Sequence, residues 1–236
     1  MMLNDKLALV TGASRGIGRA IATGLAAQGA HVIVTARTQG GLEDLDDEIK
    51  ANGGKCTLVP LDQMDPEGIE KLAEIVAERW GKLDILVAAA GQLGELTPAS
   101  QVSAKTWNEV FGVNVIAPAR LIRAFEPLLL KSDAGRAVFL TSGAAKSCRA
   151  YWAPYAASKA ALDALVTSWA DEHGNSALRI NLVNPGPMKT AMRKKAFPQE
   201  DENQLARPED ILPLILSLVG DDTTRHGEWI DFPKES

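Results

Sequence analysis

The chain alternates between short apolar runs and longer stretches with helical spacing of their apolar residues. The apolar runs predict strands at 7–12, 31–36, 56–61, 84–90, 136–142 and 179–185. The longer stretches predict helices near 16–28, 41–52, 66–80, 103–130, 154–172 and 208–219. The predicted strands are too apolar for a sheet with one face in water, so they suit a sheet covered on both faces.

Alternating strands and helices imply right-handed crossovers and a parallel sheet. The sequence shows no long linker, low-complexity tract or tandem repeat. We therefore predict a single domain over residues 1–236, an α/β fold with a doubly wound parallel sheet and helices on both faces.

The turn after the first predicted strand is rich in glycine. Gly12, Gly16 and Gly18 lie in the run TGASRGIG, between a predicted strand and a predicted helix. In that context glycines let the backbone approach a pyrophosphate at a helix N-terminus. The spacing differs from the usual G-x-G-x-x-G, and a tight turn that only needs small residues is the alternative. An ATP-binding loop is disfavoured, because no Gly-Lys-Ser/Thr follows.

The end of the second predicted strand indicates which dinucleotide would bind. An NAD site usually has an acidic residue there for the ribose 2′-hydroxyl, but this chain has Ala36 and Arg37. Arg37 and Arg15 could hold a 2′-phosphate through charge-assisted hydrogen bonds, which predicts NADP(H). The alternative is a surface arginine at a strand end.

Two aspartates follow the third predicted strand. Asp65 precedes Pro66 and has the pattern of a helix N-cap. Asp62 is then free to bind an adenine amino group. An aspartate that only stabilises a turn is the alternative.

Tyr155 precedes Lys159 by four residues in a predicted helix, so the two side chains can face the same space. An adjacent cation favours phenolate and lowers the pKa of a tyrosine. A pKa decrease from ~10 to ~7 takes roughly 4 kcal/mol, which is more than we expect from one lysine. A second positive charge would therefore help. The alternative is an ordinary aromatic residue and a solvated lysine.

Asn114 lies on the apolar stripe of the predicted helix 103–130 and therefore needs polar partners. Pro118 has no N–H to donate to the carbonyl of Asn114 and should kink the helix. One turn then offers a free carbonyl and an inward amide that could hold a water. The alternative is a kink with a satisfied core amide.

Together these residues resemble the short-chain dehydrogenase/reductase family over nearly the whole chain. The family's T-G-x-x-x-G-x-G matches residues 11–18, and its proline-glycine segment matches NPGPMKT at 184–190. Its catalytic tetrad matches Asn114, Ser142, Tyr155 and Lys159. The resemblance implies a Rossmann-like fold and a small-molecule carbonyl or alcohol substrate.

The resemblance also implies roles for these residues in hydride transfer with nicotinamide. Tyr155 would be the general acid/base, and Ser142 would hydrogen-bond the substrate oxygen. Lys159 would lower the Tyr155 pKa and bind the nicotinamide ribose, the oxidised nicotinamide would supply the second positive charge, and Asn114 would hold a water. The implied cofactor contacts are Gly12, Ser14, Arg15, Gly16, Ile17, Gly18, Arg37, Asp62, Gln63, Ala89, Gly91, Asn114, Tyr155, Lys159, Pro185, Gly186, Met188 and Thr190.

The chain departs from the family after the fourth predicted strand. Many members have N-N-A-G there, whereas this chain has A-A-A-G at 88–91. Ala89 lacks the side-chain hydrogen bonds that an asparagine makes to neighbouring strands. This puts some local rigidity in doubt, while backbone contacts to the cofactor remain available.

The substrate is less defined by the sequence. Candidate pocket walls are 92–96, 143–152 and 188–197, and residues 188–207 suit a short lid that orders on binding. Arg149, Arg193, Lys194 and Lys195 either meet an anionic substrate or form a solvated face. A 3-oxoacyl-thioester reductase, with a basic docking surface, is one alternative. A non-catalytic NADP(H)-binding sensor or scaffold is another, although the intact tetrad argues against it.

Composition narrows the remaining classes. The net charge of −5 gives no indication of nucleic-acid binding, and the longest apolar runs are too short to span a membrane. The N-terminus does not look like a signal peptide, two distant cysteines fit a reducing cytoplasm, and three scattered histidines predict no metal site. The apolar surface of helices 103–130 and 154–172 predicts a homodimer or homotetramer, as in the family.

Overall fold

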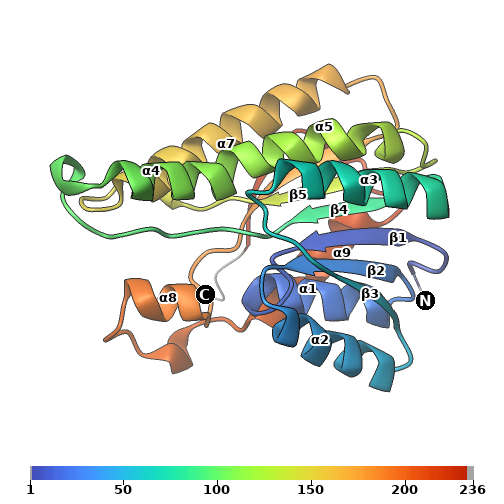
Figure 1. Cartoon of the computed structure of the whole chain (residues 1–236), viewed down its shortest axis with the longest axis horizontal. Coiled ribbons are helices and arrows are strands. Elements are labelled where there is room, and N and C mark those ends of the chain that lie inside the picture. The colour runs from blue at the N-terminus through green and yellow to red at the C-terminus, as the bar shows by residue number, and fades with distance from the viewer. Residues whose placement is uncertain (1, 233–236) are drawn as a thin grey trace.

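A parallel sheet between two layers of helices forms the centre of the protein (Figure 1). The computed structural model describes residues 2–232. The strand order is β3-β2-β1-β4-β5-β6-β7, and every neighbouring pair is parallel. The strands are β1 (Leu7–Thr11), β2 (His31–Ala36), β3 (Lys55–Pro60), β4 (Ile85–Ala88), β5 (Arg136–Leu140), β6 (Arg179–Asn184) and β7 (Trp229–Asp231). This confirms the predicted doubly wound α/β fold.

The six predicted strands are present, and β7 is a strand that the sequence analysis missed. β7 has three residues, which is too short for an alternating pattern to stand out. It forms because its backbone pairs with β6, with Val183 opposite Ile230. Its existence therefore depends on a contact between segments far apart in the chain.

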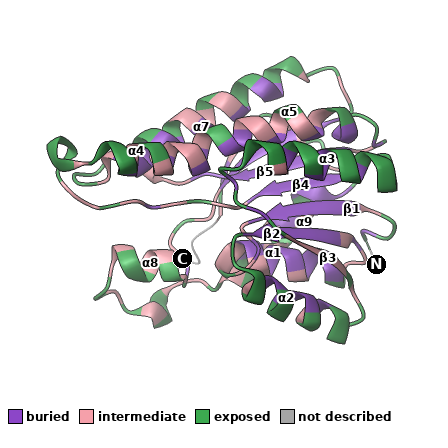
Figure 2. Cartoon of the chain, in the orientation of Figure 1, coloured by how far each residue is buried: buried purple, intermediate pink, exposed green. Residues whose placement is uncertain are grey.

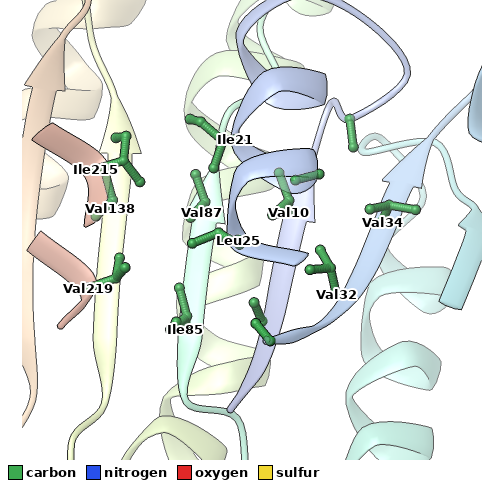
Figure 3. Packing of buried hydrophobic residues seen from close by; sticks show 14 of the residues in the cluster. Val10, Ile21, Leu25, Val32, Val34, Ile85, Val87, Val138, Ile215 and Val219 are labelled. Atoms are coloured by element: carbon green, nitrogen blue, oxygen red, sulfur yellow. The ribbon is translucent and has the colours of Figure 1, made fainter. Parts of the chain in front are cut away.

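The two helical layers bury alternate residues of the same strands, which produces two apolar clusters. Ala8 and Val10 of β1 pack with α1 (Gly16–Ala27), α2 (Gln39–Ala51) and α9 (Leu212–Val219) (Figure 3). Leu7 and Leu9 pack on the opposite face with α3 (Pro66–Trp80), α5 (Ala117–Leu129) and α7 (Ala153–Glu172). Burial on both faces explains the continuous apolar runs, and the inner strands β1, β2, β4, β5 and β6 are accordingly coloured mostly as buried in Figure 2, whereas the edge strand β3 is not.

The predicted helix 103–130 is interrupted near Pro118, as expected from a proline inside a helix. It consists of α4 (Ala104–Phe111), a π-helical turn (Gly112–Ile116) and α5. The N–H of Ala117 donates to the carbonyl of Gly112, five residues back. Such a bulge widens the helix at one turn, and this turn contains Asn114.

Shorter helices complete the chain and were missed by periodicity, because each is about one turn long. They are α6 (Ala144–Ser147) and α8 (Ala191–Ala196), with 3-10 turns at Ala99–Gln101 and Glu202–Gln204. A further 3-10 turn at Pro208–Ile211 leads into α9, so the helix predicted over 208–219 is α-helical only in its second part. Within residues 2–232, no helix is both long and apolar enough to cross a membrane.

A buried carboxylate, Asp84, holds together the amino-terminal ends of the central strands β1 and β4. Its oxygens accept hydrogen bonds from the N–H of Leu7 at 2.9 Å, Lys82 Nζ at 2.8 Å and Ser132 Oγ at 2.5 Å. Burial by itself would raise the pKa of Asp84, but these hydrogen bonds outweigh it and hold the pKa below its usual range. The ionised carboxylate therefore stabilises the fold.

We expect the free energy of unfolding of Asp84→Asn to depend less on pH in the acid range than that of the wild type. A lowered folded pKa gives stabilisation that is complete above about pH 4 and is lost as the pH falls through the folded pKa. The free energy of unfolding in urea, measured from about pH 3 to 7, should therefore fall less steeply with acid in the variant. Asp133→Asn makes the same charge change at an exposed site and serves as control. Parallel acid limbs for Asp84→Asn and the wild type would contradict this assignment.

Candidate active site

A cavity of about 1240 Å³ opens at the carboxyl ends of the strands. Its walls include Gly12 after β1, Arg37 after β2, Ala89 after β4 and Thr141 after β5. The chain leaves β1 toward one edge of the sheet and β4 toward the other, so this is the topological switch point where doubly wound proteins bind ligands.

The glycine-rich turn after β1 is packed so closely that side chains would not fit. A Cβ on Gly12 would lie 2.7 Å from the Cα of Ala90, and one on Gly18 would lie 2.4 Å from the carbonyl oxygen of Gly12. Gly16 has φ +57°, the left-handed region that favours glycine. Together these positions form an open cradle at the start of α1.

The first turn of α1 faces this cradle with its amide groups. Arg15 is the N-cap residue, and its guanidinium has no acceptor, so the side chain does not cap the first N–H groups of the helix. A helix N-terminus with free N–H groups and the positive end of the helix dipole attracts anions. The cradle therefore has the chemistry to hold a pyrophosphate.

Four polar residues predicted to contact the cofactor also line the cavity, namely Arg15, Arg37, Asp62 and Gln63. Both arginines are exposed. Asp62 accepts a hydrogen bond from the N–H of Met64 at 3.0 Å, which makes it a turn residue as well as a wall of the cavity. Gln63 is buried and donates to Thr35 Oγ1 at 3.3 Å.

The predicted N-cap role of Asp65 is confirmed. Its carboxylate accepts from the N–H of Gly68 at 3.1 Å, and Pro66 begins α3. Asp62 is therefore not needed to cap the helix.

Tyr155 and Lys159 lie one turn apart on α7, and both side chains border the cavity. Tyr155 is 8% exposed and Lys159 is 4% exposed. The Lys159 Nζ lies 5.9 Å from the centre of the Tyr155 ring and donates a hydrogen bond of 2.8 Å to the carbonyl of Leu140. The Ser142 side chain, two residues beyond Leu140, interacts with the Tyr155 side chain and favours its ionised form.

Burial dominates the electrostatics of this pair. Lys159 was predicted to lower the pKa of Tyr155, but in the protein by itself burial raises that pKa, and the Ser142 side chain offsets only part of the increase. Burial also lowers the pKa of Lys159 to about 8, against the opposing charge of Asp163. The prediction considered the helical spacing but not the desolvation of both groups.

Asn114 is completely buried behind the cavity wall. Its Oδ1 accepts from the N–H of Gln92 at 2.8 Å, and its Nδ2 donates to the Gln92 carbonyl and to Ser158 Oγ, both at 2.9 Å. The side chain thus fixes the loop after β4 against α7. Protein groups satisfy this amide, so the predicted water would have to bind the backbone carbonyl of Asn114, to which Pro118 has no N–H to donate.

The remaining predicted contacts divide into two groups. Ser14, Ile17, Gly91, Pro185 and Thr190 line the cavity together with the residues already described. Within the described part of the chain, Asn114, Ser142, Gly186 and Met188 lie outside its lining. Met188 is 2% exposed and belongs to the apolar cluster around α9, so its side chain is part of the core rather than of the cavity wall.

A neighbouring strand provides hydrogen bonds to the loop after β4, where the Ala89 side chain can make none. The Thr11 hydroxyl at the end of β1 accepts hydrogen bonds from the N–H groups of Ala89 and Ala90, both at 3.2 Å. This compensates for the rigidity that the missing asparagine put in doubt. Thr11 was quoted only as part of the glycine motif, and this bonding role was missed.

The predicted lid, 188–207, contains α8 and extends away from the sheet (Figure 1). Lys195 Nζ reaches the carbonyl of Gly94 at 3.5 Å, and the Phe197 and Trp152 rings pack 5.6 Å apart. Arg193 pairs with Glu200, and Lys194 pairs with Glu202 at 2.8 Å. Two of the four cations considered for an anionic substrate therefore already have partners.

The chain is similar to several known proteins over nearly its whole length. The family model described as short chain dehydrogenase matches residues 6–201. An uncharacterised oxidoreductase of Escherichia coli, YciK, is 42% identical, covering 95% of this chain and 90% of that protein. The 3-oxoacyl-[acyl-carrier-protein] reductase FabG of E. coli is 36% identical, covering 94% and 93%.

A solved structure shows the same arrangement. A short chain dehydrogenase from Shigella flexneri 2a, complexed with NADP, superposes with a TM-score of 0.94 at 40% identity, covering 98% of each chain. The match of the family model, the identity to its members and the shared fold agree. This chain therefore belongs to the short-chain dehydrogenase family and is an oxidoreductase of that family.

Proposed function

We propose that the protein transfers a hydride between NADP(H) and a carbonyl or alcohol substrate, with Tyr155 as general acid/base. The observation that carries this proposal is the convergence of Tyr155, Ser142 and Lys159 beside a cavity that begins with a glycine cradle. A proton-transferring group next to a dinucleotide-sized cleft is what a carbonyl reduction requires.

The cofactor assignment rests on the fit between the cavity and a phosphorylated dinucleotide. The cradle at Gly12, Gly16 and Gly18 leaves room for a pyrophosphate against α1. Arg15 and Arg37 are exposed at the cavity wall, where a 2′-phosphate would be reached by charge-assisted hydrogen bonds. The related S. flexneri protein, which was crystallised with NADP, supports the same choice.

Proton transfer falls to the chain's own residues, while the bound nicotinamide supplies or accepts the hydride. The Tyr155 phenol holds its proton at neutral pH, because the pKa of a tyrosine is ordinarily about 10 and burial raises it further. It can therefore give that proton to a carbonyl oxygen that becomes an alcohol. Ser142, which already interacts with Tyr155, is placed to orient the same oxygen. Oxidation of an alcohol uses these groups in reverse.

Lys159 has two roles in this proposal. Its ammonium, held by the Leu140 carbonyl, stabilises the negative charge that Tyr155 carries once the proton has left. It also lies at the cavity wall near Gly91, where a ribose hydroxyl would bind beside it. Asn114 keeps this part of the wall in place through Gln92.

The cofactor preference is tested by Arg37→Ala. A hydrogen bond to a charged group contributes about 1.5–3 kcal/mol, so we expect the Kd for NADPH to rise about 10- to 100-fold. NADH, which has no 2′-phosphate, should bind with nearly unchanged affinity. Nicotinamide fluorescence during titration with each dinucleotide gives both constants.

Arg123→Ala is the matched control, because Arg123 is an exposed arginine on α5 whose side chain is 81% accessible. It should leave both affinities unchanged. Equal or tighter NADH binding by the wild type would overturn the NADP(H) assignment. If neither dinucleotide binds, the cradle does not hold a pyrophosphate and the whole proposal fails.

A 3-oxoacyl-thioester reductase is a second candidate, favoured by the identity to FabG. This function would need a basic docking surface at the cavity mouth. Arg193 and Lys194 are engaged with Glu200 and Glu202, which leaves less free positive charge there than the sequence suggested. NADPH consumption with a 3-oxoacyl thioester, compared with small ketones and aldehydes, separates the two substrate classes. A non-catalytic sensor would bind NADPH and consume it with none of these compounds.

A further inference from the structure

A second carboxylate lies on the helix that carries Tyr155 and Lys159. Asp163 is on α7, one turn beyond Lys159, and is partly buried. One carboxylate oxygen accepts from the Thr141 hydroxyl, and the other accepts from Trp229 Nε1 at 3.0 Å. Asp163 thus connects α7 to the end of β5 and to β7.

The position of Thr141 makes this connection relevant to the site. Thr141 lies between Leu140, whose carbonyl holds the Lys159 ammonium, and Ser142, which interacts with Tyr155. A shift of this short segment would move both groups. Side chains that hold such a segment determine the geometry of the site without contacting the substrate.

Lys159 and Lys146 are the cations whose charges act on Asp163. Lys146 of α6 lies over the Trp229 ring, 3.1 Å from its centre, but its side chain is exposed to water. Asp231 of β7 is exposed and accepts from Asn184 Nδ2 at 2.6 Å. Lys159 is 4% exposed, and a buried ammonium is unfavourable unless a negative charge compensates it.

We propose that Asp163 is a positioning residue for Lys159, which holds the end of β5 in place and compensates the buried ammonium with its negative charge. The inference rests on the proposed function for its catalytic meaning, whereas its structural part does not. Burial lowers the pKa of Lys159 to about 8, and the Asp163 charge opposes that decrease. Burial also raises the pKa of Asp163, and the hydrogen bonds from Thr141 and Trp229 and the charge of Lys159 oppose that increase.

The test is the pH dependence of stability for Asp163→Asn, measured as unfolding in urea. A folded lysine pKa below the unfolded value means that the unfolded chain binds more protons between the two, so stability rises with pH there. Without the charge of Asp163 the folded pKa of Lys159 should fall further, so the rise of stability with pH should begin at a lower pH. We compare the unfolding constant of Asp163→Asn with that of the wild type at the same pH. Their ratio should be about tenfold larger at about pH 6 than at about pH 9.5 for each unit by which the substitution lowers the folded pKa of Lys159.

Three further variants separate charge from packing. Trp229→Phe removes one hydrogen bond but keeps the charge, so its cost should not change between about pH 6 and 9.5. Asp163→Glu keeps the charge and should restore much of the pH dependence. Lys146→Met, made in the wild type and in Asp163→Asn, should change the difference between them only slightly, because the Lys146 charge acts on Asp163 from an exposed position where water screens it.

If the loss of stability caused by Asp163→Asn is the same at every pH, Asp163 does not compensate the charge of Lys159. The alkaline limb of kcat, once a substrate is found, should move to lower pH in Asp163→Asn and stay in place in Trp229→Phe. If no substrate is turned over, the proposed function fails while the stability measurement still decides the pairing of Asp163 with Lys159.

Discussion

Tyr155→Phe is expected to lower kcat by about 10²- to 10⁴-fold, the usual contribution of a positioned general acid. The substitution removes the hydroxyl that would protonate the substrate oxygen and the partner of Ser142. The ring itself stays, so its edge-to-face packing against Trp152, with centres 5.9 Å apart, is kept. NADPH consumption with an accepted carbonyl substrate measures kcat, and fluorescence titration should show NADPH affinity within about threefold of wild type.

Tyr151→Phe is the natural control, since Tyr151 is the other of the chain's two tyrosines. It lies four residues before Tyr155 and is 59% exposed. Although Tyr151 falls in the predicted wall 143–152, its exposed side chain is not part of the cavity lining, so removing its hydroxyl should leave kcat within about twofold. If Tyr155→Phe retained most of the activity, the proton would have to come from another group and the proposed mechanism would be wrong.

Gly18→Ala is expected to lower the free energy of unfolding by about 3 kcal/mol, at the upper end of the usual cost of overpacking. Its Cβ would lie 2.4 Å from the carbonyl oxygen of Gly12 and 3.2 Å from that of Thr11. Both are backbone atoms and have no rotamer to change, so α1 must move away from β1. That movement opens the cradle, and we expect NADPH affinity to fall by at least about tenfold.

Gly40→Ala tests whether this cost comes from the contact rather than from the loss of a glycine. Gly40 lies in the first turn of α2, and within residues 2–232 a Cβ there meets nothing closer than 4 Å. Alanine favours a helix over glycine by about 1 kcal/mol, so this variant should be as stable as wild type or more stable. Urea unfolding and NADPH titration of both variants give the comparison. Equal stability of Gly18→Ala and wild type would show that α1 is not tightly packed on β1.

The hydrophobic pattern predicted most of the fold because the folding units are local. Each strand buried on both faces needs a continuous apolar run, and each covering helix needs an apolar stripe, so six strands and the major helices could be located. Elements without such a pattern were missed. β7 exists through its pairing with β6, and α8 is a helix of six residues.

The same division applies to the candidate site. Turn chemistry and helical spacing are local, so the glycine cradle, the N-cap at Asp65 and the shared face of Tyr155 and Lys159 followed from the sequence. The roles assigned to the tetrad remain predictions for the kinetics to test. Asp163 follows Lys159 by four residues, and this spacing could have drawn attention to it in the sequence. Its partners Thr141 and Trp229, however, come from distant segments.

By itself the sequence determined the order of the strands and helices, the glycine turn and the residue types available for chemistry, because these depend on neighbours a few positions away. The tertiary structure decided what surrounds each group. It packed Asn114 against Gln92 and Ser158, supported the Ala89 loop through Thr11, and buried Tyr155 and Lys159 so deeply that desolvation controls the direction of both pKa shifts. Burial and long-range hydrogen bonds arise only when distant segments meet, and so the protonation of the site is a property of the folded protein.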